Sequence, residues 1–336
     1  MQIIPDTGYP RSPFVAARET ADDGFSQGWG FYFAPSEAYW VDAHIHLRGC
    51  TTLADATKAM HDFFYHLEAY RLGRIVAFIE DEALFDICAA LSEADPRFTW
   101  FYWPEPTEDL AVIQRAFARG AVGMKLHNHK AMKGEFDPAV WESPRWNEIF
   151  AFLNEKKAVV NWHVTQRVAN SPYHGGGANA YWEEGIFKGV TFTNRDLLAQ
   201  CLRIADANPN LSMIGAHQLY LSNARLAELF AAHKNLYVDT SIGYFLRWAD
   251  TLPPEDLHLV RDFVIAHADR MIFGSDTIVT PENVGPYLIE SWKCHARFIS
   301  GLKLPYEALQ AVTHGNIERL LRLPPCDETR KFCSRP

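Results

Sequence analysis

The chain has 336 residues, of which 48% are hydrophobic and 22% are charged, and its formal net charge is −9. This composition is typical of a globular protein and is a poor fit for a disordered, collagenous or coiled-coil chain. The negative charge argues against nucleic acid or an anionic membrane as the main partner. We therefore expect a small-molecule ligand, no nucleic-acid partner and no membrane partner.

The cysteines and the first residues bear on the compartment. Six scattered cysteines form no CxxC pair, which favours reduced thiols and a cytoplasmic location. No run approaches the ~20 apolar residues of a membrane span, and Met1 to Pro13 lack a signal-peptide pattern. The many aromatic residues suit core packing or subunit contacts, which leaves a homo-oligomer open.

Residues 1–40 contain repeated prolines and glycines and are interpreted as an N-terminal arm or lid. From residue 41, short apolar runs alternate with helical stretches. The runs cover residues 41–46, 74–80, 98–103, 121–127, 158–163, 211–217, 236–241 and 270–276.

Eight strands that alternate with helices predict an α/β fold, a (β/α)₈ TIM barrel over residues 41–323 with helices at its C-terminal end. Residues 324–336 would form a tail. A doubly wound open sheet is the alternative, but it would not explain why histidines converge. One of the helices is expected over 194–207, with Asn194 as its N-cap.

Several predicted strands end in metal-ligand residue types. The first ends in His44-Ile-His46, and residues two apart on a strand point to the same side. His163, His217 and Asp276 end the fifth, sixth and eighth strands. All these ends open on one mouth of a parallel barrel, and imidazole and carboxylate are ligands of zinc and similar ions. The sequence therefore predicts a metal site at that mouth.

Four stretches carry a resemblance to a known family. They are VDAHIH (41–46), GAVGMKLH (120–127), FGSDT (273–277) and HGNIERLLRL (314–323). Over roughly residues 40–323 the chain resembles the amidohydrolase superfamily, and more narrowly its amidohydrolase-2 branch of metal-dependent TIM-barrel hydrolases and decarboxylases.

The resemblance implies roles for the residues at the mouth. A divalent metal would be held by His44, His46, His163 and Asp276, with a position left open for water. Asp276 would move the proton of that water. His217 would act as an acid, a base or an electrophile, or would bind a second metal.

The number and identity of the metals stay open at this point. We expect one ion, with zinc favoured, although histidine and carboxylate also suit manganese and iron. A second metal depends on Lys125, because some relatives carry a carbamylated lysine on the fourth strand. We favour an unmodified, charged Lys125 that grips an anionic group.

Further polar and aromatic residues follow the strand ends and are expected to bind substrate. Three cations suggest an anionic substrate, and arginine suits a carboxylate. Structural ion pairs on loops are the alternative for each of them. The predicted substrate-binding residues are Arg48, Lys125, Arg167, His174, Trp103 and Tyr244.

The leading functional hypothesis is a metal-dependent hydrolase of a small, anionic organic molecule, with an ester, lactone or amide bond broken by activated water. The alternative is a non-oxidative decarboxylase. The run His217-Gln-Leu-Tyr-Leu221 argues against a decarboxylase without excluding it, because aromatic-acid decarboxylases often have a different run after this histidine. Hydration of a double bond is a third chemistry, and a catalytically inactive barrel that binds a ligand is the non-enzymatic alternative.

Overall fold

A computed structural model describes residues 38–165, 190–241, 257–282 and 286–326. Nine strands pair in parallel, in the order β8-β7-β6-β5-β4-β3-β2-β1-β9. The strands are β1 (Trp40–Leu47), β2 (Leu72–Ile79), β3 (Phe98–Tyr102), β4 (Gly123–His127), β5 (Val159–His163), β6 (Ser212–Gly215), β7 (Leu236–Asp239), β8 (Met271–Ile272) and β9 (Thr277–Val279).

The eighth strand position is divided between two short segments. β8 pairs with β7, and β9 pairs with β1. Between them the backbone N–H of Ala43 donates to the carbonyl of Phe273 at 3.0 Å, so β1 also bonds to the chain that leaves β8. The predicted barrel is confirmed, although the single strand expected over 270–276 is interrupted where it reaches the mouth.

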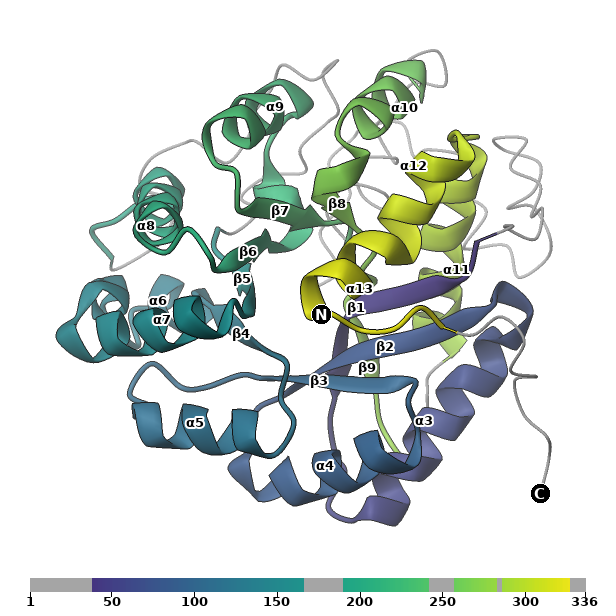
Figure 1. The fold of residues 1–336 in the computed structure, drawn as a ribbon, viewed down its shortest axis with the longest axis horizontal. Helices are drawn as coiled ribbons and strands as arrows, with labels where there is room; N and C mark the ends of the chain where they lie inside the picture. The colour runs from purple at the N-terminus through teal and green to yellow at the C-terminus, as the bar shows by residue number, and fades with distance from the viewer. Residues whose placement is uncertain (1–37, 166–189, 242–256, 283–285, 327–336) are drawn as a thin grey trace.

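Helices surround the strands on their outer side, with one exception (Figure 1). The helices are α3 (Leu53–Leu67), α4 (Phe85–Ala94), α5 (Leu110–Ala118), α6 (His129–Met132), α7 (Pro144–Lys156), α8 (Asn194–Ala207), α9 (Asn223–Ala232), α10 (Leu257–Ala266), α11 (Pro286–Gly301), α12 (Tyr306–Gln310) and α13 (Asn316–Leu321). The exception is α13, which lies across the strands in Figure 1 and buries Ile317 and Leu321 in the cluster inside the barrel. In the part of the chain that the structure describes, none of these helices is long and apolar enough to cross a membrane.

The helix α3 shows why such segments form and dock. Thr52 and Asp55 form a capping box at its start, which satisfies two otherwise unpaired backbone N–H groups. Ala56, Met60 and Phe63 repeat at helical spacing and are buried against the barrel.

The start of α8 lies one residue from the prediction. Thr193, rather than Asn194, is the N-cap of α8, and Asp196 completes a capping box with it. The expectation for Asn194 was wrong because Asn194 is already the first helical residue, and the carboxylate three residues beyond Thr193 pairs with Thr193.

Candidate metal centre

An irregularity in β1 turns the two histidines into the barrel. Val41 and Ala43 belong to the apolar cluster inside the strands, whereas Trp40 packs on the outer side. The register with β2 shifts between Asp42 and Ile45. Strict alternation would point residue 44 outward with residue 40, so the shift is what brings His44 to the inner face.

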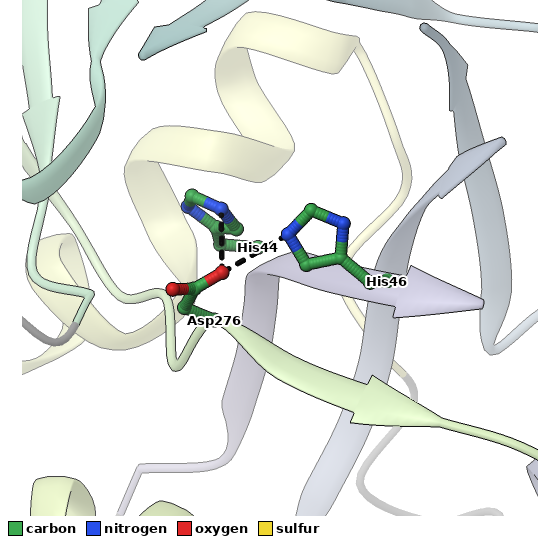
Figure 2. A group of neighbouring side chains, drawn as sticks. All are labelled: His44, His46 and Asp276. Atoms are coloured by element: carbon green, nitrogen blue, oxygen red, sulfur yellow. Dashed lines mark hydrogen bonds and ion pairs between the residues drawn. The ribbon is translucent and has the colours of Figure 1, made fainter. Parts of the chain in front are cut away.

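Three side chains converge at the mouth (Figure 2). The Nε2 atoms of His44 and His46 lie 3.2 and 3.0 Å from Oδ1 of Asp276. Among the described residues, these three form a group whose ligand atoms all lie within 4.8 Å of one another. Metal–ligand bonds of ~2.1 Å put neighbouring ligand atoms about 3.0 to 3.4 Å apart. Both separations from Asp276 therefore suit neighbouring ligands of one divalent ion.

Asp276 reaches this position through an uncommon backbone. Its φ is 59°, in the left-handed region, and its N–H donates to the carbonyl of His44 at 2.9 Å. A Cβ on Gly274 would lie only 2.8 Å from Cβ of His44. A glycine is therefore needed for the eighth strand position to pass so close to β1.

Burial and charge set the protonation of the three residues. The pKa of Asp276 lies well below its ordinary value. Burial raises this pKa, but the neighbouring imidazoles, His44 first, lower it by more. Burial lowers the pKa of His46 to about 4, so its imidazole is neutral at pH 7. Burial and Lys125 lower the pKa of His44, yet Asp239 and Asp276 prevail and raise it. The centre thus combines a carboxylate with an imidazole that can bind a cation.

His163 and His217 lie together beside this group. His163 ends β5 as predicted, and its Nδ1 lies 3.1 Å from Nε2 of His217. Burial lowers the pKa of His217 to about 4 and that of His163 well below its ordinary value, so both rings are neutral. His163 is not among the three residues that converge most closely, but stands against His217 and the ring of His127.

His217 does not end a strand, contrary to the prediction. β6 stops at Gly215, and residues 217–220 all have positive φ, between 49° and 57°. Gly215 permits this turn, because a Cβ there would lie 2.5 Å from the Leu219 side chain. The turn is held by the N–H of His217, which donates to Asp239, and by the hydroxyl of Thr165, which donates to the carbonyl of Leu219.

Asp239, at the end of β7, was missed by the sequence analysis. Its Oδ2 lies 2.8 Å from Nδ1 of His44 and accepts from Asn161 Nδ2 at 2.8 Å, while its Oδ1 accepts from Ser241. Its pKa is lowered despite complete burial, chiefly by His44. A signal was present in the sequence, because Asp239 closes an apolar run just as the predicted ligands do.

Lys125 faces the centre and not the solvent. Its side chain is fully buried on β4, its Nζ donates to Oδ1 of Asn161 at 2.7 Å, and the same Nζ lies 3.3 Å from Nε2 of His44. Burial lowers its pKa to about 8. The Lys125 side chain is thus occupied by contacts inside the barrel.

The remaining predicted substrate-binding residues lie at the rim or outside the described residues. Arg48 forms an exposed ion pair with Glu80 at 2.7 Å. Trp103 follows β3 and stacks on His127, with ring centroids 5.3 Å apart and an interplanar angle of 8°. Arg167, His174 and Tyr244 lie outside the described residues.

The barrel with histidine and aspartate side chains at its mouth indicates a class of enzyme, and comparison with protein families identifies it. The family model described as Amidohydrolase, of the amidohydrolase-2 branch, matches residues 41–323, and the chain belongs to this family. The family comprises enzymes with hydrolase and decarboxylase members. No curated protein matches the chain.

Solved structures share the fold at low identity. A probable 2-pyrone-4,6-dicarboxylic acid hydrolase from Acinetobacter baumannii is 12% identical, with a TM-score of 0.54 over 84% of this chain and 99% of its own. A 2,6-dihydroxybenzoate decarboxylase from Rhizobium is 14% identical, with a TM-score of 0.54 over 85% and 99%. An amidohydrolase with bound zinc from Burkholderia multivorans is 18% identical, with a TM-score of 0.53 over 85% and 100%.

Proposed function

We propose that this protein is a metal-dependent hydrolase of a small, anionic organic molecule. The observation that supports this most is the convergence of the two Nε2 atoms of His44 and His46 on Oδ1 of Asp276. His163 is proposed as a fourth ligand, since its ring contacts His217, which lies beside this group. A divalent ion, with zinc favoured, would supply electrophilic activation of water and of a carbonyl oxygen.

The residues of the chain then have separate tasks. Asp276 is ionised and about a quarter exposed, so its carboxylate can take the proton of an attacking water and return it to the leaving group. His217 is neutral and held by Ser241, and its Nε2 faces Nδ1 of His163, so it can fix the ring of the proposed fourth ligand. Lys125 keeps a positive charge beside His44 and balances the two carboxylates Asp239 and Asp276.

The substrate is proposed to be a carboxylated small molecule that enters at the mouth. Arg48 lies on the rim, and its exposed ion pair with Glu80 can exchange for a substrate carboxylate at little cost. Fold relatives named for a pyrone dicarboxylic acid and for a dihydroxybenzoate are consistent with a carboxylated substrate.

The test starts with metal content per chain of protein purified without chelator, followed by a substrate panel. About one equivalent of metal is expected, together with hydrolysis of a carboxylated lactone, ester or amide that chelator removes. His163→Ala should lose both metal and turnover while the fold survives. A metal-free protein with no gain of activity on adding zinc would refute the proposal.

The same panel distinguishes the second candidate, non-oxidative decarboxylation. It should contain carboxylated aromatics, with released CO₂ measured alongside hydrolysis. CO₂ release without hydrolysis would replace the proposed reaction and keep the metal centre. Two metals per chain would instead indicate that Lys125 is carbamylated and bridges the two ions.

A further inference from the structure

We infer that Asp239, the last residue of β7, and Ser241, two residues further on, place a proton on Nδ1 of His44, His217 and His163. The catalytic purpose of this arrangement depends on the proposed function, but the arrangement itself follows from the hydrogen bonds. Asp239 and Ser241 would thus be positioning residues that act through the histidines.

Asp239 acts on His44. The carboxylate is fully buried and already accepts from the N–H groups of His217, Ser241 and Asn161, so Nδ1 of His44 is the donor over 2.8 Å. Nε2 of His44 faces the Asp276 carboxylate over 3.2 Å, so a bound cation would take the place of a proton at that nitrogen while Nδ1 keeps its own. A histidine ligand whose second nitrogen donates to a carboxylate has its ring orientation and tautomer fixed.

The carbonyl of Ser241 acts on His217. It lies 3.0 Å from Nδ1 of His217, and a carbonyl oxygen can only accept, so this nitrogen carries the proton. The hydroxyl of Ser241 agrees with this assignment, because it donates to Asp239 and can therefore accept from the same nitrogen at 2.9 Å. In the neutral ring, Nε2 of His217 is then an acceptor.

The effect passes on to His163. Its Nδ1 lies 3.1 Å from the accepting Nε2 of His217, so Nδ1 of His163 is the donor. The Nε2 atom of His163 therefore keeps its lone pair. The opposite tautomer would present an N–H at that atom and could not bind a cation.

Both arms depend on one carboxylate. Oδ1 of Asp239 accepts from the N–H and the hydroxyl of Ser241 and from the N–H of His217, while Oδ2 serves His44. One carboxylate thereby helps to place the Nδ1 protons of residues on two different strands, His44 on β1 and His163 on β5.

The first test reads the tautomers directly. Long-range ¹H–¹⁵N correlation spectra would be recorded on histidine-labelled, metal-free protein at about pH 8. This pH lies above the ordinary histidine pKa, so the rings are neutral. His163 and His217, assigned from the spectra of single His→Gln variants, should both carry the proton on Nδ1. A proton on Nε2 of either ring would overturn the inference, whether or not the protein binds metal.

The second test reads metal affinity. Asp239→Asn presents an amide to His44 and should weaken zinc binding by roughly 10- to 100-fold. Glu318→Gln is the matched control, because Glu318 is a buried carboxylate that bonds Tyr39, Arg74 and the imidazole of His314 but none of the proposed metal ligands. Zinc affinity should be unchanged in the control. Equal affinity in both variants and wild type would overturn the inference.

The two outcomes separate this inference from the proposed function. Wild-type protein that binds no zinc would end the proposed function, while the tautomer spectra would still decide the inference. If Asp239→Asn does not fold, Ser241→Ala provides the second variant. It removes the hydroxyl and keeps the carbonyl, so His217 should retain its proton on Nδ1, and loss of that tautomer would contradict the role of the carbonyl.

Discussion

Gly274→Ala tests whether the close approach of β1 and the eighth strand position holds the metal ligands in place. The new Cβ would lie 2.8 Å from Cβ of His44, and an ordinary contact begins at 3.4 Å, so one side must move by at least 0.6 Å. Metal sites tolerate displacements of only ~0.2 Å in ligand distance. The displacement falls between His44 and Asp276, two proposed ligands of the same ion.

We expect two measurable effects from this substitution. Overpacking should lower the free energy of unfolding of the metal-free protein by about 1–3 kcal/mol, measured in urea. Zinc affinity, measured by competition with a chromophoric chelator, should fall by roughly tenfold or more.

Gly73→Ala provides the control for Gly274→Ala. A Cβ on Gly73 would meet Tyr39 and Cys326 at 3.1 Å, at the start of β2 and away from the ligands. This variant should keep its zinc affinity whatever the change in its stability. Wild-type zinc affinity in Gly274→Ala would refute the reasoning that this contact sets the ligand geometry.

Three further outcomes are expected. Zinc at about 100 times its Kd should stabilise the protein by about 2.7 kcal/mol, seen as a higher Tm that chelator reverses. The Asp276→Asn variant should lose this increase in Tm. An increase that persists in the variant would show that Asp276 is not a ligand. Burial raises the pKa of Asp42 to about 6, so the folded protein holds this proton more tightly than the unfolded chain does, and its contribution to stability is lost as pH rises from about 4 to above 6. The stability of Asp42→Asn relative to wild type should therefore increase by about 3 kcal/mol over that range, and a difference independent of pH in urea titrations would contradict the assignment. Arg48→Met should raise KM for a carboxylated substrate with little change in kcat, while Glu80→Gln should not raise it; equal KM values in Arg48→Met and wild type would return Arg48 to a structural role.

The barrel could be predicted from the sequence because its evidence is local. Each strand is a short apolar run and each helix has its own periodicity, so the alternation is visible without tertiary information. The ligands His44 and His46 could be proposed for the same reason, since they share one strand.

The interactions between strands could not be predicted. The register shift in β1 depends on its pairing with β2, and nothing within residues 41–46 encodes it. The burial of Lys125 depends on Asn161, which lies on another strand. The sequence places Lys125 at the correct face of the barrel, but only the structure shows that its Nζ contacts side chains inside the barrel.

The left-handed turn at 217–220 escaped prediction for a different reason. Such backbone normally indicates glycine, yet these four residues are His, Gln, Leu and Tyr. Tertiary contacts override the local preference here. The hydrogen bonds from His217 to Asp239 and from Thr165 to Leu219 connect residues 22 and 54 positions apart.

This turn has a consequence for the order in which the protein folds. Left-handed backbone costs roughly 1–2 kcal/mol per residue. The total cost of four such residues is close to the net free energy of unfolding of an ordinary domain. The turn cannot form in an isolated β6 segment, because it needs Asp239 from β7 and the chain that leaves β5. We therefore expect His217 to reach its place only after β5, β6 and β7 have paired.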